Sequence, residues 1–264
     1  IKALASPTSL PSLNGGYAMN KQAVDETVLN AIPDFDGHEQ VIHFTDEASG
    51  LDAYIAVHNT NLGPALGGCR MTTYTSHKEA LQDVVRLSRG MTYKNALAGL
   101  PLGGGKSVII GDAFKDKNES LLRAMGQAVH SLEGSYITAE DSGTKEKDMR
   151  IIAEETPYVV GMRDNDCPLG GDPSPVTAYG VFVGIKAAVN LRFGKNSVKG
   201  LTVAVQGLGA VGYDLCRYLH KEGASLIVTD IREETLAKAK EEFENLTVVK
   251  SEEIFSVEAD IFAP

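Results

Sequence analysis

Residues 201–230 follow the order strand, glycine-rich turn, helix, strand, acid, which constrains the fold more than any other part of the sequence. The apolar, largely β-branched run 201–205 predicts a buried strand. The turn 207–212 reads Gly-Leu-Gly-Ala-Val-Gly, and the pattern after it predicts a helix over 210–221. A second strand is expected over 225–229. Together with alternating strand and helix patterns elsewhere, this unit predicts an α/β fold.

Each part of this turn suits the binding of a dinucleotide. Gly207 permits the tight turn, Gly209 lets the backbone approach a pyrophosphate, and Gly212 lets the helix pack closely on the strand. The helix begins at Ala210 and Val211, where unpaired N–H groups and the positive end of the helix dipole favour phosphate. The sequence leaves one alternative open, namely a glycine-rich turn of a βαβ unit that binds no ligand.

The acid that ends the second strand favours NAD as the cofactor. Asp230 lies 23 positions after Gly207, where a carboxylate accepts hydrogen bonds from the adenosine ribose and repels a 2′-phosphate. Arg232 follows closely, and an arginine at this place could tolerate NADP. We predict NAD.

Composition excludes several other classes of protein. Lys plus Arg is 25 and Asp plus Glu is 35, so the formal net charge is −10 and nucleic acid is not an expected partner. No run of 18 apolar residues exists, so no membrane span is expected. The three cysteines (Cys69, Cys167 and Cys216) are far apart, which indicates reduced thiols in a cytoplasmic protein. The six histidines show no ligand spacing, and no metal is predicted.

The first part of the chain predicts a mixed set of strands and helices. A helix is expected after Met19, two strands joined by a turn over 41–59, and a helix over 76–90 that is capped by Ser76 and stopped by Gly90. Further along, a strand is expected at 107–110, a helix at 119–132 and a strand at 135–139. A cluster of Pro, Gly and Asp over 164–175 predicts a loop and a domain junction.

Both ends of the chain differ from the rest. Residues 1–18 are rich in Ser, Pro and Gly, without the pattern of a signal peptide. We interpret them as a disordered leader or as translated upstream sequence before a natural start at Met19. The last residues stop inside an expected strand, which predicts that the chain is truncated.

The segment 100–107 resembles a phosphate-binding P-loop but does not match it. The pattern would need glycine at position 100, which is Leu100, and a helix after Lys106, where a strand is expected. Nucleotide hydrolysis is therefore rejected. What remains is Lys106 among three glycines, with Lys94 twelve positions upstream and Asp141 after a later strand.

Four segments carry a resemblance to a known family. Residues 62–71, 91–107, 139–144 and 171–177 are similar, in the same order, to the glutamate, leucine, phenylalanine and valine dehydrogenases, and most to the leucine enzymes. The resemblance implies an N-terminal substrate domain with a mixed sheet and a C-terminal Rossmann-type NAD-binding domain that is incomplete here. The expected boundaries are 1–18 for the leader, 19–165 for the substrate, catalytic and oligomerisation domain, and 166–264 for the NAD domain.

The resemblance also implies roles for individual residues. Lys94 resembles the lysine that binds the substrate α-carboxylate, Lys106 the catalytic lysine, and Asp141 the aspartate that handles protons at the amino group. Gly67 and Gly68 resemble the pair that lines the carboxylate side of the site. Thr177 resembles a residue near the nicotinamide. The NAD-binding positions of the family match those already predicted from the turn 207–212 and from Asp230.

Two positions imply the substrate. Glutamate enzymes carry a lysine where this chain has Leu66, and a carboxylate buried there would have no partner. Ala139 resembles the leucine and valine enzymes more than the phenylalanine enzymes, which tend to have glycine in this region. We therefore predict reversible oxidative deamination of a branched-chain L-amino acid, L-leucine first, to a 2-oxo acid and ammonia, by a homo-oligomer. The alternatives are a phenylalanine-type enzyme and a non-catalytic NAD-binding module.

Overall fold

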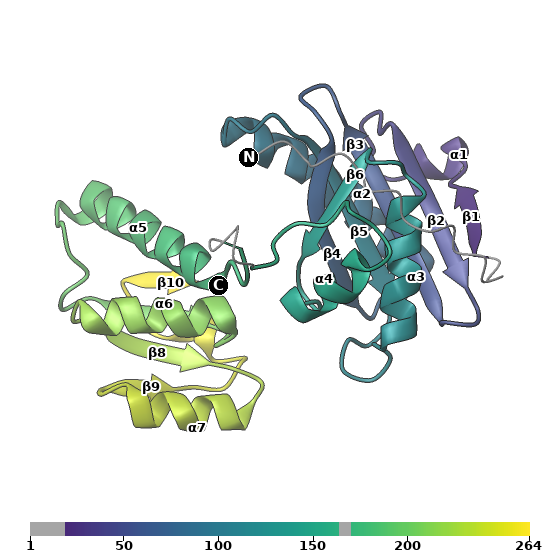
Figure 1. Cartoon of the computed structure of the whole chain (residues 1–264). Coiled ribbons are helices and arrows are strands. Elements are labelled where there is room, and N and C mark those ends of the chain that lie inside the picture. The colour runs from purple at the N-terminus through teal and green to yellow at the C-terminus, as the bar shows by residue number, and fades with distance from the viewer. Residues whose placement is uncertain (1–18, 164–169) are drawn as a thin grey trace. The chain divides into compact units, whose positions relative to one another are not determined.

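The computed structural model describes residues 19–163 and 170–264, which form two compact units (Figure 1). One unit ends at Asp172 and the other begins at Pro173. The expected leader 1–18, the expected domain boundary at 165 and Cys167 lie outside the described residues. Among those that are described, no helix is both long and apolar enough to cross a membrane.

The first unit contains a six-stranded mixed sheet in the order β1-β2-β3-β5-β4-β6. Strands β1, β2, β3 and β5 pair antiparallel, whereas β4 pairs parallel with both β5 and β6. The carboxyl ends of β4, β5 and β6 therefore lie at one edge of the sheet. The strands are β1 (Asn20–Ala23), β2 (Gln40–Asp46), β3 (Leu51–Asn59), β4 (Ala65–Thr72), β5 (Gly103–Ile110) and β6 (Tyr136–Glu140).

Helices cover both faces of this sheet (Figure 1). Helix α2 packs Leu81 and Val84 against Val108 of β5 in one apolar cluster. Helices α3 and α4 pack residues such as Met125 and Met149 in a second cluster on the other face. The helices of this unit are α1 (Glu26–Leu29), α2 (His77–Leu97), α3 (Glu119–His130) and α4 (Glu146–Ala153).

Two sequence predictions in this unit were wrong in part. Ser76 caps α2 as predicted, by accepting the N–H of Glu79, but the helix continues through Gly90 to Leu97. Packing of α2 on the sheet outweighs the helix-breaking tendency of one glycine, which is worth only about 1 kcal/mol. After Met19 the chain forms the short strand β1 before the single helical turn α1, because β1 finds a pairing partner in β2.

The glycines before Lys106 allow close packing around β5. A Cβ atom on Gly104 would lie 2.1 Å from the backbone nitrogen of Thr92 in α2, and one on Gly105 would lie 2.6 Å from the Tyr136 ring. Both positions thus let neighbouring elements approach the strand. The strand continues through Lys106 to Ile110, so the rejection of a P-loop is confirmed.

The second unit contains a four-stranded parallel sheet in the order β10-β7-β8-β9. In chain order this is the 3-2-1-4 arrangement with which doubly wound dinucleotide folds begin. The predicted βαβ unit is confirmed, with its helix over the predicted residues. The elements are α5 (Ser174–Phe193), β7 (Thr202–Gln206), α6 (Ala210–Lys221), β8 (Ser225–Thr229), α7 (Glu233–Glu242), β9 (Leu246–Val248), a 3-10 turn (Ile254–Ser256) and β10 (Ile261–Ala263).

The close approach of α2 to β5 predicts a large effect of a single methyl group. Gly104→Ala should lower the free energy of unfolding by about 2 kcal/mol or more, because its Cβ would overlap backbone atoms of α2. Gly90→Ala is the matched control in α2, where a Cβ meets no atom within 4 Å, and it should raise stability by about 0.5–1 kcal/mol. Urea unfolding of both variants measures the difference, and equal midpoints would contradict this packing.

Candidate active site

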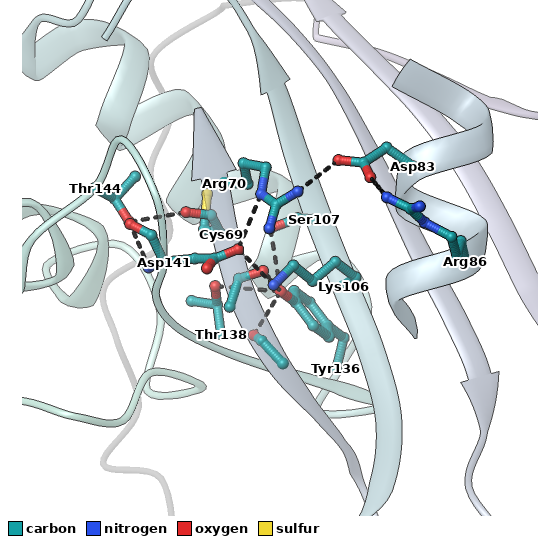
Figure 2. Close-up of polar contacts among 12 residues, drawn as sticks. Cys69, Arg70, Asp83, Arg86, Lys106, Ser107, Tyr136, Thr138, Asp141 and Thr144 are labelled. Carbon is teal, nitrogen blue, oxygen red and sulfur yellow. Dashed lines mark hydrogen bonds and ion pairs between the residues drawn. The ribbon is translucent and has the colours of Figure 1, made fainter. Parts of the chain in front are cut away.

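A buried ion pair joins β5 to the end of β6. The side chain of Lys106 is only 7% exposed, and its Nζ lies 2.5 Å from Oδ2 of Asp141 (Figure 2). A buried ammonium without a partner is strongly disfavoured, so Asp141 is the group that makes Lys106 tolerable in the sheet. The structure therefore brings together the two residues for which the sequence predicted catalytic roles.

The absence of a side chain at Gly68 leaves room for this pair. Strand β4 lies between β5 and β6, so the ion pair spans β4. A Cβ atom on Gly68 would lie 2.7 Å from Cβ of Asp141, closer than such atoms approach. Any larger residue at this position would displace the carboxylate from Lys106.

A threonine holds the turn that carries Asp141. The Oγ1 atom of Thr144 accepts the N–H of Asp141 at 2.9 Å and donates to the carbonyl oxygen of Cys69 at 2.8 Å. This links the turn after β6 to β4. Sequence reasoning missed Thr144, although a threonine three positions after an aspartate is a usual way to close such a turn.

Arg70 places a second cation beside the same carboxylate oxygen. Its Nε lies 3.3 Å from Oδ2 of Asp141, and its Nη1 donates to Asp83 of α2 at 2.8 Å. Asp83 also accepts hydrogen bonds from Tyr74 and Arg86, each at 2.9 Å (Figure 2 shows Arg70, Asp83 and Arg86). Sequence reasoning missed this network; the available signal was an arginine two positions after Gly68, on the same face of a half-buried strand.

These charges set the ionisation of Asp141. Burial alone would raise its pKa, but the ammonium of Lys106, a backbone N–H and the guanidinium of Arg70 together hold the pKa below its usual range. Asp141 is therefore a carboxylate next to Lys106.

Tyr136 of β6 fixes the backbone of β4. Its hydroxyl donates to the carbonyl oxygen of Gly67 at 2.9 Å. Burial raises the pKa of Tyr136, so the hydroxyl keeps the proton that it donates.

Lys94 lies exposed in the last turn of α2. It forms no ion pair or side-chain hydrogen bond with any residue in 19–163 or 170–264. The next residue, Asn95, is buried and donates to the carbonyl oxygen of Gly103 at 2.5 Å, which fixes this turn to β5. The position of the Lys94 backbone is thus tied to the strand that carries Lys106.

The remaining predicted substrate residues lie on β4 and β6. Leu66 and Ala139 are half-buried, and Ala139 pairs in register with Gly68. Gly67 is buried, and a Cβ there would overlap the carbonyl oxygen of Gly105 at 1.7 Å, so packing of β4 on β5 requires this glycine. The roles of these residues toward a substrate stay predictions.

In the second unit, the turn before α6 has the geometry expected for a dinucleotide. Gly207 has a φ of +92°, and a Cβ on Gly212 would lie 2.0 Å from the carbonyl oxygen of Gly207. A Cβ on Gly209 would meet no atom within 4 Å, so space is open there. No side chain caps the first turn of α6, where Ala210 and Val211 lie, so its N–H groups remain available.

Asp230 holds this turn and the residue that follows β8. Its carboxylate accepts the N–H of Leu208 at 2.6 Å and the N–H of Arg232 at 2.8 Å. Burial would raise the pKa of Asp230, but these backbone donors and the Arg232 side chain lower it.

Thr177, in the first turn of α5, is exposed, and its hydroxyl donates to the carbonyl oxygen of Pro173 at 3.0 Å.

An open hollow adjoins this turn. Its lining combines the start of α6 with α7 and includes two cations. The residues are Leu208, Gly209, Ala210, Tyr213, Arg232, Glu234, Thr235 and Lys238. The open space at Gly209, the uncapped helix and the acid at the end of β8 fit a dinucleotide.

The fold and these sites define an α/β protein with a mixed-sheet unit that buries a Lys–Asp pair and a parallel unit of the dinucleotide-binding type. Residues 38–158 match the dimerisation domain of the Glu/Leu/Phe/Val dehydrogenases. The resemblance to this family that was inferred from the sequence is thus confirmed, over residues 38–158 by this match and over 86% of the chain by the relatives below.

Relatives with different substrates match most of the chain. The chain is 58% identical to leucine dehydrogenase from Geobacillus stearothermophilus, over 86% of this chain and 61% of that protein. It is 49% identical to phenylalanine dehydrogenase from Lysinibacillus sphaericus, over 86% of this chain and 60% of that protein. The chain thus spans about three fifths of the length of these relatives.

Solved structures agree on the fold. L-tryptophan dehydrogenase from Nostoc punctiforme superposes with a TM-score of 0.62 at 46% identity, over 86% of this chain and 64% of that one. A glutamate dehydrogenase from Thermus thermophilus, 22% identical, has a TM-score of 0.65 over 92% of this chain and 60% of that one, which shows a shared fold. The predicted α/β fold class is confirmed.

The lowered pKa of Asp141 predicts how this ion pair responds to acid. The pKa in the unfolded chain is about 3.9, so the pair contributes stability above that pH and loses it as the pH falls through the lower folded value. A carboxyl-carbon NMR titration should therefore give Asp141 a pKa below about 3.9. Lys106→Met should raise that pKa, whereas Lys115→Met, at an 81% exposed side chain, should not. A normal pKa in the unaltered chain would contradict the pairing.

Proposed function

We propose that this chain carries the site for NAD-dependent, reversible oxidative deamination of a branched-chain L-amino acid, with L-leucine preferred. The products are the 2-oxo acid and ammonia. The observation that carries this proposal is the buried pair of Lys106 and Asp141, 2.5 Å apart, in a chain 58% identical to a leucine dehydrogenase.

NAD, when bound, supplies the acceptor for the hydride that leaves the substrate Cα. We propose that the turn 207–212 and the start of α6 hold its pyrophosphate, that Asp230 binds the adenosine ribose, and that Thr177 lies near the nicotinamide. The open space at Gly209 and the uncapped N–H groups of α6 support this assignment. The remaining steps use the residues of the first unit.

Lys106 acts as the general base at its Nζ atom. Oxidation leaves an iminium carbon, and water attacks that carbon while Lys106 takes a proton from the water, so a C–O bond forms. Lys106 must enter this step as the neutral amine, while Asp141, 2.5 Å away, is a carboxylate placed to relay a proton. Asp141 then relays the proton that Lys106 took from water to the amino group. Lys106 accepts the proton of the new hydroxyl as the C=O double bond forms, the C–N bond breaks and ammonia leaves.

Lys94 holds the substrate α-carboxylate in this proposal. An exposed ammonium without an ion-pair partner among the described residues has its charge available for a carboxylate. The anchor from Asn95 to β5 supports a fixed position for this turn. Gly67 and Gly68 then line the carboxylate side of the site.

Leu66 and Ala139 are proposed to contact the substrate side chain. Leu66 is half-buried and apolar, so it favours an aliphatic side chain over a second carboxylate.

The matched family domain is called a dimerisation domain, which supports subunit contacts through the first unit of a homo-oligomer. The free thiols of Cys69 and Cys216 support a reducing, cytoplasmic location.

Turnover tests the proposal directly. The purified chain, mixed with NADH, ammonium and 4-methyl-2-oxopentanoate, should oxidise NADH, and Lys106→Met should lower kcat by about a thousandfold because the general base is lost. Lys115→Met, a surface lysine, should leave the rate unchanged. NADH fluorescence measures cofactor binding separately, and it should be retained in Lys106→Met. NADH binding without turnover in the unaltered chain would contradict the enzyme and indicate the non-catalytic module.

The substrate assignment has its own test at Ala139. The unaltered chain should turn over 4-methyl-2-oxopentanoate faster than phenylpyruvate. Ala139→Gly should shift the ratio of the two kcat/KM values toward phenylpyruvate by about tenfold, because one methyl group in a substrate pocket is worth about 1–3 kcal/mol. Preference for phenylpyruvate before any substitution would instead identify a phenylalanine-type enzyme.

A further inference from the structure

Three potential metal ligands from separate elements meet on the first unit. His43 belongs to β2, Asp52 to β3, and His77 is the first residue of α2. One ligand atom from each lies within 4.8 Å of the other two. Their sequence separations match no usual ligand motif, so the group exists only because of the fold.

The sheet register and helix packing explain this meeting. His43 lies directly opposite Tyr54 in the antiparallel β2–β3 pair, and Asp52 is two positions before Tyr54, so all three share one face. Helix α2 packs on the face that contains Tyr54 and begins at His77. The first turn of α2 is thus brought over these strand residues.

The distances are close to those of a metal centre. The Nε2 atom of His43 lies 2.7 Å from Oδ1 of Asp52, and Nε2 of His77 lies 3.5 Å from Oδ2 of the same carboxylate. Tetrahedral zinc with bonds of about 2.0–2.1 Å places its ligand atoms about 3.3 Å apart. All three side chains are partly exposed, and their ligand atoms lie within 4.8 Å of one another before any ion is bound.

Tyr54 orients both imidazoles. Its ring stacks on His43 with centroids 4.4 Å apart, and its hydroxyl lies 3.2 Å from Nδ1 of His77. When Nδ1–H of His77 donates to the tyrosine oxygen, Nε2 keeps its lone pair for a metal. A simple His43–Asp52 ion pair needs neither the second histidine nor this support.

We propose that His43, Asp52 and His77 bind one divalent transition-metal ion of the zinc type. Two neutral imidazoles and a carboxylate are ligands that suit Zn²⁺, Co²⁺ and Ni²⁺, with a fourth position left to water. The ion takes the place of the direct contact between Nε2 of His43 and Oδ1 of Asp52. It joins the first turn of α2 to β2 and β3.

This site is separate from the proposed catalytic residues. His77 and Lys94 are seventeen positions apart on α2, which is roughly 25 Å along the helix. None of the three ligands is hydrogen-bonded or ion-paired to Lys106 or Asp141. Metal binding here does not depend on the proposed dehydrogenase activity, and the two ideas can fail independently.

A cobalt titration tests the site. The whole chain, without an affinity tag and treated with chelator, should bind one equivalent of Co²⁺ with visible d–d absorption, and Zn²⁺ should displace it. His77→Ala and Asp52→Asn should each weaken binding by at least about tenfold, and Tyr54→Phe should weaken it less while keeping the ring stack. His130→Ala, at an exposed histidine on α3, is the matched control and should bind as the unaltered chain does.

Thermal unfolding provides a second readout that does not rely on colour. Zn²⁺ should raise the melting temperature of the unaltered chain and of His130→Ala, but not that of His77→Ala. His77 is exposed at a helix end, so this variant is expected to fold. The proposal is wrong if no cobalt binds, if His77→Ala binds equally well, or if a near-ultraviolet charge-transfer band shows that a cysteine thiolate is the ligand.

Discussion

The buried charge of Lys106 is the constraint on which the first unit depends. An ammonium inside a sheet costs several kcal/mol unless a carboxylate compensates it. That carboxylate comes from the turn after β6, and it reaches Lys106 only because Gly68 has no side chain. Thr144 then fixes the turn to β4, so this one ion pair constrains Gly68 on β4, Lys106 on β5 and the turn after β6.

Strand direction explains why the pair can form at all. Most of the sheet is antiparallel, but β4, β5 and β6 are parallel, and their carboxyl ends meet at one edge. Arg70, on β4 between the other two strands, adds a second cation to Asp141 and is held by Asp83 of α2. Helix α2, which carries Lys94 in its last turn, is thereby connected to Asp141 through Asp83 and Arg70. The proposed carboxylate-binding residue and the proposed catalytic pair are thus connected through the same helix and strands.

The sequence predicted the features that local patterns determine. The helix over 210–221 and the strand over 225–229 follow from glycines, an acid and apolar periodicity that lie within thirty residues of each other. The end of α2 was predicted wrongly at Gly90, because the packing that extends this helix comes from β5. Arg70 with Asp83, and His43 with His77, were not predicted as groups, since their partners meet only through strand register and helix packing.

Asp230 shows how one carboxylate can support both a turn and a proposed cofactor preference. Its Oδ1 accepts both the N–H and the Nε–H of Arg232, while its Oδ2 accepts only the N–H of Leu208. A carboxylate oxygen can accept two hydrogen bonds, so Oδ2 retains capacity for a ribose hydroxyl. Arg232 is bound to Asp230 and also donates to the carbonyl oxygen of Leu208 at 3.2 Å. Its charge is therefore already compensated, and a 2′-phosphate would have to compete with Asp230 for it, which supports NAD rather than NADP.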